Sequence, residues 1–345
     1  MLKNLTVSGL RNLELSLNFS PNVNVIVGVN GSGKSSILEA IHFLSFGRSF
    51  RAASADLMIN TQSEYASIQA TVEQRSLPYS ISAIRYRGKS QVKLQESSVR
   101  LSKVIPLLPT LFVDCDSHRS FFSSITYRQR FLDWLVFHVE PGYMQWVRIY
   151  NKALLERNSA LKLGMSPTPW DPILHEQAMK IHTARQNIFK QLQVVLSKKA
   201  LFSDKLSLFY FPGFDSDTGL LSDLKGSLQR DIQLRRTTKG PHKADWVVRT
   251  KQDDAKNILS QGQQKTAHLK IVMAHKEIMS MDGKKPLLLI DDLSAELDSQ
   301  HRILINQLIE AGNGQSIITA VLEKDAGIYP SERLFHVKQG AEVRD

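Results

Sequence analysis

A glycine-rich loop between an apolar segment and a helical segment constrains this 345-residue chain more than any other feature. Residues 28–35 read Gly-Val-Asn-Gly-Ser-Gly-Lys-Ser, which fits the pattern G-x-x-x-x-G-K-[ST] of phosphate-binding loops. Residues 23–27 are typical of a buried strand, and apolar residues recur at helical spacing after the loop. A strand, loop and helix in this order aim backbone N–H groups and a positive helix end at an anion. The segment therefore predicts a nucleotide-binding site in an α/β fold.

The loop residues have separate expected roles in this site. Lys34 is expected to neutralise the β- and γ-phosphates of ATP, which makes it a candidate catalytic residue, and the Ser35 hydroxyl is expected to bind Mg²⁺. The glycines allow the backbone to come close to the phosphates. The residues predicted to contact the nucleotide are Gly28, Val29, Asn30, Gly31, Ser32, Gly33, Lys34, Ser35 and Ser36. The alternative, a chance glycine-rich turn, is disfavoured by the flanking strand and helix.

A second informative segment lies near the C-terminus, where four apolar residues at 287–290 are followed by Asp291 and Asp292. This pattern predicts a central parallel strand whose carboxyl end faces a ligand crevice. We expect Asp291 to bind Mg²⁺ through water, because Mg²⁺ prefers oxygen ligands and retains much of its hydration. We expect Asp292 to orient or deprotonate an attacking water as a catalytic residue. The alternative for this segment alone is an ordinary strand with a polar end.

A third segment, Leu-Ser-Gln-Gly-Gln-Gln-Lys at 259–265, resembles the L-S-G-G-Q signature of ABC-type ATPases. Residues 294–298 follow the acidic strand, where that class has its D-loop. The resemblance implies that Ser260, Gly262 and Gln263 contact the γ-phosphate of ATP held by the other protomer, with Ser260 also catalytic. It therefore implies a homodimer with two ATP molecules in a symmetric interface. A helix start rich in Ser, Gln and Gly is common by itself, but the order of the motifs favours the ABC interpretation.

Composition favours a globular protein with an anionic partner. The net charge of +11, from 44 Lys and Arg against 33 Asp and Glu, favours nucleic acid, and most of the excess lies before residue 231. The alternative is a basic protein without such a partner. No apolar run is long enough to span a bilayer, and the N-terminus lacks a secretory signal. Cys115 is the only cysteine, which excludes an intramolecular disulfide, so we expect a cytoplasmic protein without a membrane partner.

The motifs lie at both ends of the chain and must meet on one sheet. We therefore expect a discontinuous ATPase lobe formed by residues 1–125 and 231–345, with a helical lobe inserted at 126–230. This insertion is far too short for the long coiled coil of an SMC-type ATPase.

The local patterns predict the elements of both lobes. Residues 80–87 alternate at period two and predict a strand. Helical spacing runs from about 127 to 199 and is interrupted at 164–172, where prolines predict a loop. Residues 211–227 are expected to form a loop, and strand character returns at 246–249.

Blocks along most of the chain resemble the RecF family of bacterial recombination-repair proteins. They lie at residues 38–41, 47–51, 131–134, 137–141, 157–161, 240–245 and 291–298. The resemblance implies an ABC-type P-loop ATPase lobe with an inserted α-helical lobe, ATP and Mg²⁺ as cofactors, and weak DNA-dependent ATP hydrolysis. It implies roles in recombinational repair, replication-fork maintenance and the SOS response. ATP would close a homodimer on double-stranded, gapped or single-stranded DNA, and the family works with RecR and RecO in loading RecA.

Several positions depart from the RecF pattern. Ser35 stands where threonine is usual, and both residues present a hydroxyl to Mg²⁺. Asp116 stands where the family has the glutamate of a Pro-Glu pair, one methylene longer. Residues 317–321 lack the switch histidine of ABC transporters, as RecF-like proteins also do. Together with Asp292 in place of the transporter glutamate, this absence predicts slow hydrolysis, because misplacement by about 1 Å can cost about 10²-fold in rate.

Several basic residues have two open interpretations each. Arg48 and Arg51 contact phosphate or solvate a turn, and His242 and Lys243 contact DNA or nucleotide or lie on a surface turn. The basic run on the helical insertion lines a DNA channel or forms a solvated face. It consists of Arg128, Arg130, Arg148, Lys152 and Arg157. Trp134, Trp146 and Tyr150, interleaved with it, have the spacing of core residues.

Three alternative functions remain open on the residues alone. An ATPase subunit of a membrane transporter would need a switch histidine and an ordinary helical subdomain before the signature. A nuclease fused to an ABC-like ATPase would need an acidic metal cluster after residue 298. A scaffold that binds ATP without hydrolysing it is opposed only by the pair Asp291 and Asp292.

Overall fold

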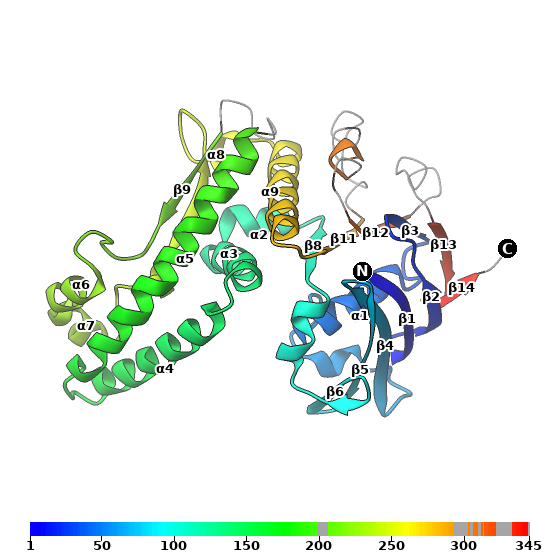
Figure 1. Ribbon diagram of the computed structural model, residues 1–345, viewed down its shortest axis with the longest axis horizontal. Coiled ribbons are helices and arrows are strands. Elements are labelled where there is room, and N and C mark those ends of the chain that lie inside the picture. The colour runs from blue at the N-terminus through cyan, green and yellow to red at the C-terminus, as the bar shows by residue number, and fades with distance from the viewer. Residues whose placement is uncertain are drawn as a thin grey trace. The chain divides into compact units, whose positions relative to one another are not determined.

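The computed structural model describes residues 1–198, 206–292, 303, 306–309, 312, 314–321 and 333–343 (Figure 1). Its contacts divide the chain into two compact units. The first unit consists of Met1–Ser117 and Lys265–Asp345, and the second consists of His118–Gln264. The first unit is therefore built from both ends of the chain, as the separation of the sequence motifs requires.

One layer of the first unit is an antiparallel sheet, which has six strands within the described residues. Their order is β2-β1-β4-β5-β6-β7, with β1 at Leu2–Leu10, β2 at Leu13–Asn18, β4 at Tyr65–Gln74, β5 at Leu77–Tyr86, β6 at Lys89–Leu94 and β7 at Ser97–Ser98. Ile81 and Ala83 on β5 are buried and alternate with more exposed neighbours, which confirms the strand predicted from period-two spacing.

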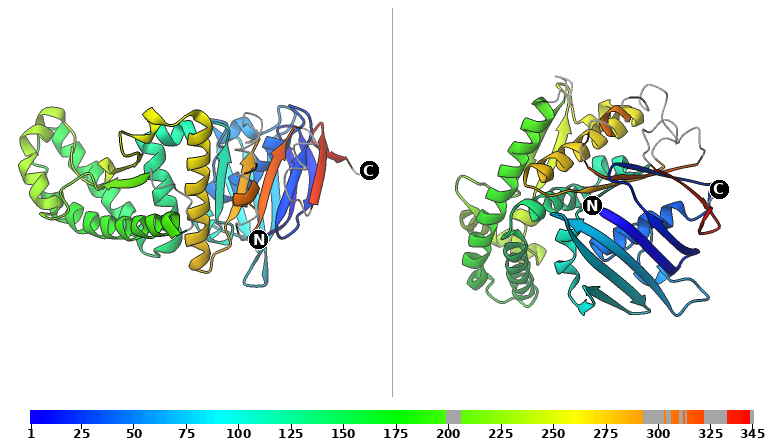
Figure 2. Two further views of the ribbon diagram at one scale, coloured as in Figure 1. Left: turned by 90° about the horizontal axis from the view of Figure 1, so that it is seen from above. Right: turned by 45° about the vertical axis from the view of Figure 1, so that its right-hand side comes forward.

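The other layer is a mostly parallel sheet, again with six strands within the described residues. Their order is β14-β13-β3-β12-β11-β8, with β3 at Val23–Val27, β8 at Thr110–Asp114, β11 at Leu287–Asp291, β12 at Ser316–Ala320, β13 at Arg333–Lys338 and β14 at Ala341–Val343. β3 pairs with β12 and β13, so the N-terminal and C-terminal strands lie side by side (Figure 2). β3 and β12 are buried along their whole length, which explains why most of their residues are apolar.

Helix α1, at Lys34–Phe46, contacts strands of both sheets and contributes to one hydrophobic core with them. Short 3₁₀ turns, at Ala55–Met58, Leu101–Lys103 and Ile105–Leu107, complete this part of the chain. The parallel strands β3, β12, β11 and β8 all present their carboxyl ends at one edge of their sheet. This is the edge at which open α/β sheets bind ligands.

The second unit is mainly helical. Its elements are α2 at Ser117–Ser123, α3 at Ile125–Val139, α4 at Tyr143–Lys162, a 3₁₀ turn at Thr168–Trp170, α5 at Asp171–Lys198, β9 at Ser207–Phe211, α6 at Leu220–Gly226, α7 at Leu228–Leu234, a 3₁₀ turn at Pro241–Lys243, β10 at Asp245–Arg249 and α8 at Ala255–Ile258. Helix α9, at Gln261–Met281, begins in this unit and continues into the first. The long helices α4 and α5 pack along each other (Figure 1).

Two features of the second unit differ from the sequence-based expectations. The loop expected at 211–227 contains α6, because Leu220 and Leu224 lie four residues apart and are both fully buried. The compact unit also extends beyond the expected limits 126–230, because β10 forms an antiparallel pair with β9 and so stays with the helices. The strand predicted at 246–249 is confirmed as part of β10.

Candidate nucleotide-binding site

The phosphate-binding loop connects the buried strand β3 to α1, as the sequence predicts. Gly33, the N-cap of α1, has φ 112° and Gly31 has φ 81°, values that side chains disfavour. At Gly28 a Cβ atom would lie 2.4 Å from the carbonyl oxygen of Val337 and 2.6 Å from Ser32 Oγ. The loop therefore requires glycine at these positions, and it leads into a helix N-terminus, which is a favourable place for an anion.

Lys34 lies folded against the loop that precedes it. Its Nζ donates to the carbonyl oxygens of Gly28 at 2.6 Å and Val29 at 3.1 Å. Burial lowers the pKa of Lys34, and the carboxylates of Asp292 and Asp291 oppose that shift. The buried hydroxyl of Ser32 has no hydrogen-bond partner in the part of the chain that the structure describes. The loop thus holds a cation and an unused hydroxyl donor, both suited to an anionic ligand.

Asp291 joins the loop helix to two strands. Its Oδ1 accepts hydrogen bonds from Ser35 Oγ at 2.9 Å and from Thr319 Oγ1 at 2.8 Å. Burial raises the pKa of Asp291, while the bonds from Thr319 and Ser35 and the positive charge of Arg51 lower it. The carboxylate is thus held in place but poorly solvated, which is the condition of a group that gains from a nearby cation.

Thr319 is a site residue that sequence reasoning missed. Besides its bond to Asp291, its Oγ1 accepts from the backbone N–H of Asp292 at 2.9 Å. Asp292 itself has φ 46°, a left-handed conformation in which aspartate is tolerated better than most residues. A threonine after two isoleucines in the buried strand Ser316–Ala320 was the available signal.

These residues surround a cavity of about 240 Å³. Its lining consists of Arg11, Asn12, Asn30, Gly31, Gly33, Lys34, Ser35, Ser36, Arg51, Asp291 and Asp292. Arg11 is held by the fully buried Glu39 through bonds of 2.5 and 3.0 Å. The structure thus brings the loop and the acidic strand end together, and it adds Arg11, Asn12 and Arg51 to the wall. Of the two interpretations of Arg51, the position at the cavity is consistent with a phosphate contact.

A further carboxylate lies next to Asp291. Asp114, at the end of β8, is the register partner of Asp291, and its charge contributes to raising the pKa of Asp291. Ser117 Oγ donates to Asp114 at 2.7 Å. Asp116, the residue considered as a replacement for the usual glutamate, is exposed and is not among the residues that line the cavity. Asp114 is therefore the nearer of the two carboxylates to Asp291 along the sheet edge.

Comparisons with known proteins agree with this geometry. Residues 1–341 match the family described as the RecF/RecN/SMC N terminal domain. The chain is 35% identical to the DNA replication and repair protein RecF of Pseudomonas entomophila, over 98% of this chain and 97% of that protein. The chain belongs to the RecF family.

Solved structures extend the likeness to RecF from sequence to fold. The structure of the recombination mediator protein RecF with ATP superposes with a TM-score of 0.87 at 26% identity, over 99% of this chain and 97% of that one. An Smc head bound to the C-winged helix domain of ScpA shares the fold, with a TM-score of 0.63, 17% identity, and coverage of 99% and 95%. The expected fold class, an ABC-type P-loop ATPase lobe with an α-helical lobe, is thereby confirmed. No helix in the described ranges is long and apolar enough to cross a membrane.

The segment that resembles the ABC-type signature lies at the start of α9, in the second unit. Ser260 and Gln263 hold each other reciprocally. The backbone N–H of Gln263 donates to Ser260 Oγ at 3.3 Å, and that of Ser260 donates to Gln263 Oε1 at 3.0 Å. This is the arrangement of a capping box, and Ser260, Gln263 and the half-buried Gly262 form an exposed helix start. The expected D-loop, 294–298, lies outside the described residues.

The basic run of the second unit separates into two groups. Arg128 and Arg157 are buried in ion pairs, Arg128 with Asp245 at 2.8 Å and Arg157 with Asp171 at 2.7 Å. They are therefore unavailable to DNA, and the interpretation of these two arginines as lining residues of a DNA channel is wrong. Helical spacing alone could not reveal this, because their partners lie on distant segments. The remaining members of the run are exposed: Arg130, Arg148 and Lys152.

His242 also points into the second unit and not outward as its turn suggests. Its Nδ1 lies 2.7 Å from the hydroxyl of the buried Tyr150, and its Nε2 lies 3.2 Å from the carbonyl oxygen of Thr237. Burial lowers the pKa of His242 to about 4. Lys243 is exposed, so of His242 and Lys243 only Lys243 is available to contact a ligand.

Proposed function

We propose that this chain is an ATP-dependent DNA-binding protein of recombinational repair and replication-fork maintenance. ATP closes a homodimer on DNA near gaps or junctions, and slow hydrolysis releases it. The observation that carries the proposal is the contact of Ser35 with Asp291 beside Lys34, in a cavity that both ends of the chain form. The Pseudomonas entomophila relative is named a DNA replication and repair protein, which supports the same role.

The nucleotide is the substrate of this site. The triphosphate lies against residues 28–36, and Lys34 exchanges its two carbonyl acceptors for phosphate oxygens. Mg²⁺ fits beside it, because the Ser35 hydroxyl is a hard oxygen ligand of the kind that this ion prefers, and the Asp291 carboxylate, 2.9 Å from that hydroxyl, would hold the ion through water. When bound, Mg²⁺ neutralises phosphate charge. Arg11 and Arg51, on the cavity wall, add positive charge on the protein side.

Asp292 is the catalytic carboxylate in this proposal. The hydrogen bond to Thr319 fixes the backbone of Asp292 at the end of β11. From this position the Asp292 side chain orients the attacking water. Aspartate is one methylene shorter than the glutamate of active transporters, and this difference makes hydrolysis slow. The protein is then a weak DNA-dependent ATPase, in which hydrolysis acts as a timer.

The second half of each ATP site comes from another copy of the chain. Ser260, Gly262 and Gln263 contact the γ-phosphate of the ATP held by the partner protomer, with the Ser260 hydroxyl as a catalytic donor. The exposed position of this helix start supports such a contact, because backbone donors and the helix dipole attract an anion there. The interface is symmetric, so two ATP molecules are enclosed together.

The proposed partners follow from charge and family. The net charge of +11 supports binding to double-stranded, gapped and single-stranded DNA. RecR, acting with RecO, is the proposed protein partner, and the outcome is loading of RecA on single-stranded DNA. In this proposal, residues 1–125 and 231–345 form the ATPase lobe, and residues 126–230 form the helical insertion lobe.

Sedimentation velocity of the purified chain tests the dimer directly. We expect a shift from monomer to dimer with ATP and Mg²⁺, no shift with ADP, and no shift for Ser260→Arg, which still binds ATP in its own loop. A phosphate-release assay run in parallel separates a slow ATPase from a scaffold that binds ATP without cleaving it. A monomer at saturating ATP would overturn the proposed mechanism.

A further inference from the structure

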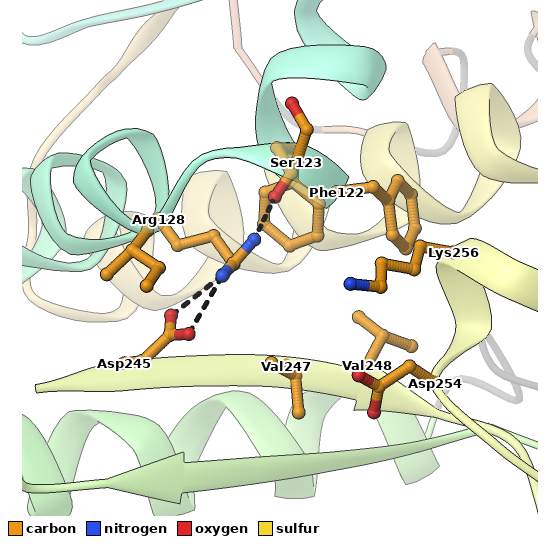
Figure 3. Close-up of a pocket in the computed structure, with 10 residues that line it drawn as sticks. Phe122, Ser123, Arg128, Asp245, Val247, Val248, Asp254 and Lys256 are labelled. Atoms are coloured by element: carbon orange, nitrogen blue, oxygen red, sulfur yellow. Dashed lines mark hydrogen bonds and ion pairs between the residues drawn. The ribbon is translucent and has the colours of Figure 1, made fainter.

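A second cavity, of about 250 Å³, lies entirely within the second unit (Figure 3). The end of α2, the start of α3, strand β10 and helix α8 contribute its walls. One part of the lining is apolar, formed by Phe122, Ile125, Val247 and Val248. Ile125 is 51% exposed, which is high for a large aliphatic side chain at the edge of a cavity. Nothing in the ATPase proposal uses this cavity.

The charged groups of the lining are paired, with one exception. Arg128 Nε and Nη2 donate to the two oxygens of Asp245 at 2.8 Å each, and Nη1 donates to the carbonyl of Phe121 at 2.8 Å. Asp254 is paired with Arg249 at 2.8 Å. Figure 3 shows the side chain of Lys256 extending into the cavity, and no group in the described part of the chain forms a hydrogen bond or ion pair with its ammonium.

The apolar lining continues onto an exposed aromatic surface. Phe209 and Phe211 on β9 are the register partners of Val247 and Asp245, so their side chains lie on the same face of the two-stranded sheet as those two lining residues. These two phenylalanines are 43% and 44% exposed. The guanidinium of Arg249 lies 5.4 and 5.9 Å from the centres of their rings. Contiguous exposed aromatic surface beside a cavity is a common feature of protein interaction sites.

We infer that this cavity binds the C-terminal residue of a partner protein, with an apolar side chain against Val247 and Phe122 and the terminal carboxylate on Lys256. A C-terminal residue carries its carboxylate and its side chain on one Cα, so both reach their partners within a cavity of about 250 Å³. The charges match, because no described group binds the Lys256 ammonium directly, whereas Arg128, Asp245 and Asp254 are each held in an ion pair.

Nucleic acid fits this cavity less well than a peptide terminus. A phosphodiester chain brings several negative charges, and the lining already contains the carboxylates of Asp245 and Asp254. The apolar walls also offer no partner to phosphate, whereas they match a leucine or phenylalanine side chain. The proposed occupant is therefore the C-terminal residue of a protein, and the experiment below also tests for binding of DNA.

Fluorescence anisotropy with a labelled peptide tests the inference without nucleotide, so its result does not depend on the ATPase proposal. The probe is fluorescein-Gly-Ser-Gly-Ser-Leu-Phe with a free C-terminal carboxylate, titrated with the full chain. We expect the carboxylate form to bind about tenfold more tightly than the C-terminal amide, the usual contribution of one charge-assisted hydrogen bond. Replacing the terminal phenylalanine of the peptide with alanine should weaken binding by about tenfold or more.

Two protein variants separate a specific contact from general charge. Lys256→Gln should bind the carboxylate and amide peptides equally, whereas Lys251→Gln, another exposed lysine outside the cavity lining, should keep the tenfold difference. Both positions are exposed, so neither change threatens folding. The inference is overturned by equal binding of the two peptides to the unmodified protein, by equal effects of the two variants, or by displacement of the peptide by a short oligothymidylate.

Discussion

The hydroxyl of Ser35 donates a 2.9 Å hydrogen bond to the carboxylate of Asp291, 256 residues further along the chain. The bond joins the first turn of α1 to the end of β11, and Thr319 adds a second bond from β12 at 2.8 Å. The half-buried carboxylate of Asp291 beside the phosphate-binding loop lowers the local stability, because a poorly solvated acid favours its neutral form. Removing the charge of Asp291 is therefore a first test of the proposed magnesium site.

Asp291→Asn should stabilise the nucleotide-free protein while abolishing its stabilisation by ATP and Mg²⁺. Burial raises the pKa of Asp291 in the folded state, so the folded protein holds this proton more tightly than the unfolded chain does. Its contribution to the free energy of unfolding therefore falls as pH rises through the interval between the unfolded and folded pKa values. The cost of this carboxylate to the folded state is therefore larger at pH 7 than in acid. Thermal unfolding at pH 7 should therefore show a higher midpoint for Asp291→Asn than for the unmodified protein.

The matched control for this substitution is Asp116→Asn, an exposed aspartate outside the cavity lining. This variant should leave both the nucleotide-free midpoint and the shift with ATP and Mg²⁺ unchanged. An Asp291→Asn protein that melts lower than the unmodified chain without nucleotide would contradict the assignment of a desolvated, destabilising carboxylate.

Asp292→Asn should slow ATP hydrolysis by about 10²-fold or more while leaving ATP-dependent self-association intact. Asparagine tolerates the left-handed φ of 46° at this position, and the backbone bond to Thr319 needs no side-chain charge, so the local structure should be retained. Phosphate release measures the first effect, and sedimentation velocity measures the second. Unchanged turnover would remove Asp292 from the catalytic role.

Mixing two inactive variants tests whether each ATP site uses two protomers. Lys34→Ala removes the loop lysine, and Ser260→Arg blocks the signature, so each variant alone should neither self-associate with ATP nor hydrolyse it. In a mixed dimer, one site combines the intact Lys34 of one protomer with the intact Ser260 of the other. Partial recovery of hydrolysis is therefore expected, and it should saturate near equal amounts of the two proteins. If no mixture of the two variants hydrolyses ATP, each site is complete within one chain.

The elements of this site that follow a strict chemical pattern were predictable from sequence. Residues 28–35 and the end of β11 have their positions fixed by local geometry, because glycine φ values and a buried strand leave few alternatives. Thr319 was not predicted. Its role depends on β12 lying between β3 and β11, and this strand order is a property of the whole sheet.

The second unit shows a different limit of sequence-based prediction. Helical spacing gave α3, α4 and α5, but it could not show which of the arginines on those helices are compensated. Arg157 forms bonds of 2.7 Å to both Asp171 and Asp231, the second of them 74 residues away. A basic run therefore overstates the charge that a surface offers, because pairing with distant acids is invisible in local sequence.

The protein should lose stability in mild acid because of half-buried histidines such as His242. Burial lowers the pKa of His242 from the ordinary 6.5 to about 4, so between these values the unfolded chain binds the proton more strongly. The free energy of unfolding therefore falls as pH decreases from about 6.5 towards 4. Each pH unit across that window contributes roughly 1.4 kcal/mol from this group. Denaturant unfolding at pH 7 and pH 5 measures the change.

His242→Gln serves as the comparison for this pH effect. It should be less stable than the unmodified protein at pH 7, because it loses the contact with Tyr150. Its stability should nevertheless fall less steeply between pH 7 and 5. Parallel curves for the two proteins would show that His242 is not the titrating group.

The central claim, a DNA clamp gated by ATP, is tested most directly by anisotropy of a labelled gapped duplex at one fixed salt concentration. Salt is fixed because phosphate contacts make affinity steeply dependent on it. The account predicts tight binding with ATP, weak binding with ADP, and loss of the ATP-dependent component in Lys34→Ala and Ser260→Arg. Binding of equal strength with ATP, with ADP and in both variants would contradict the account, since the basic surface and the ATPase would then be unconnected.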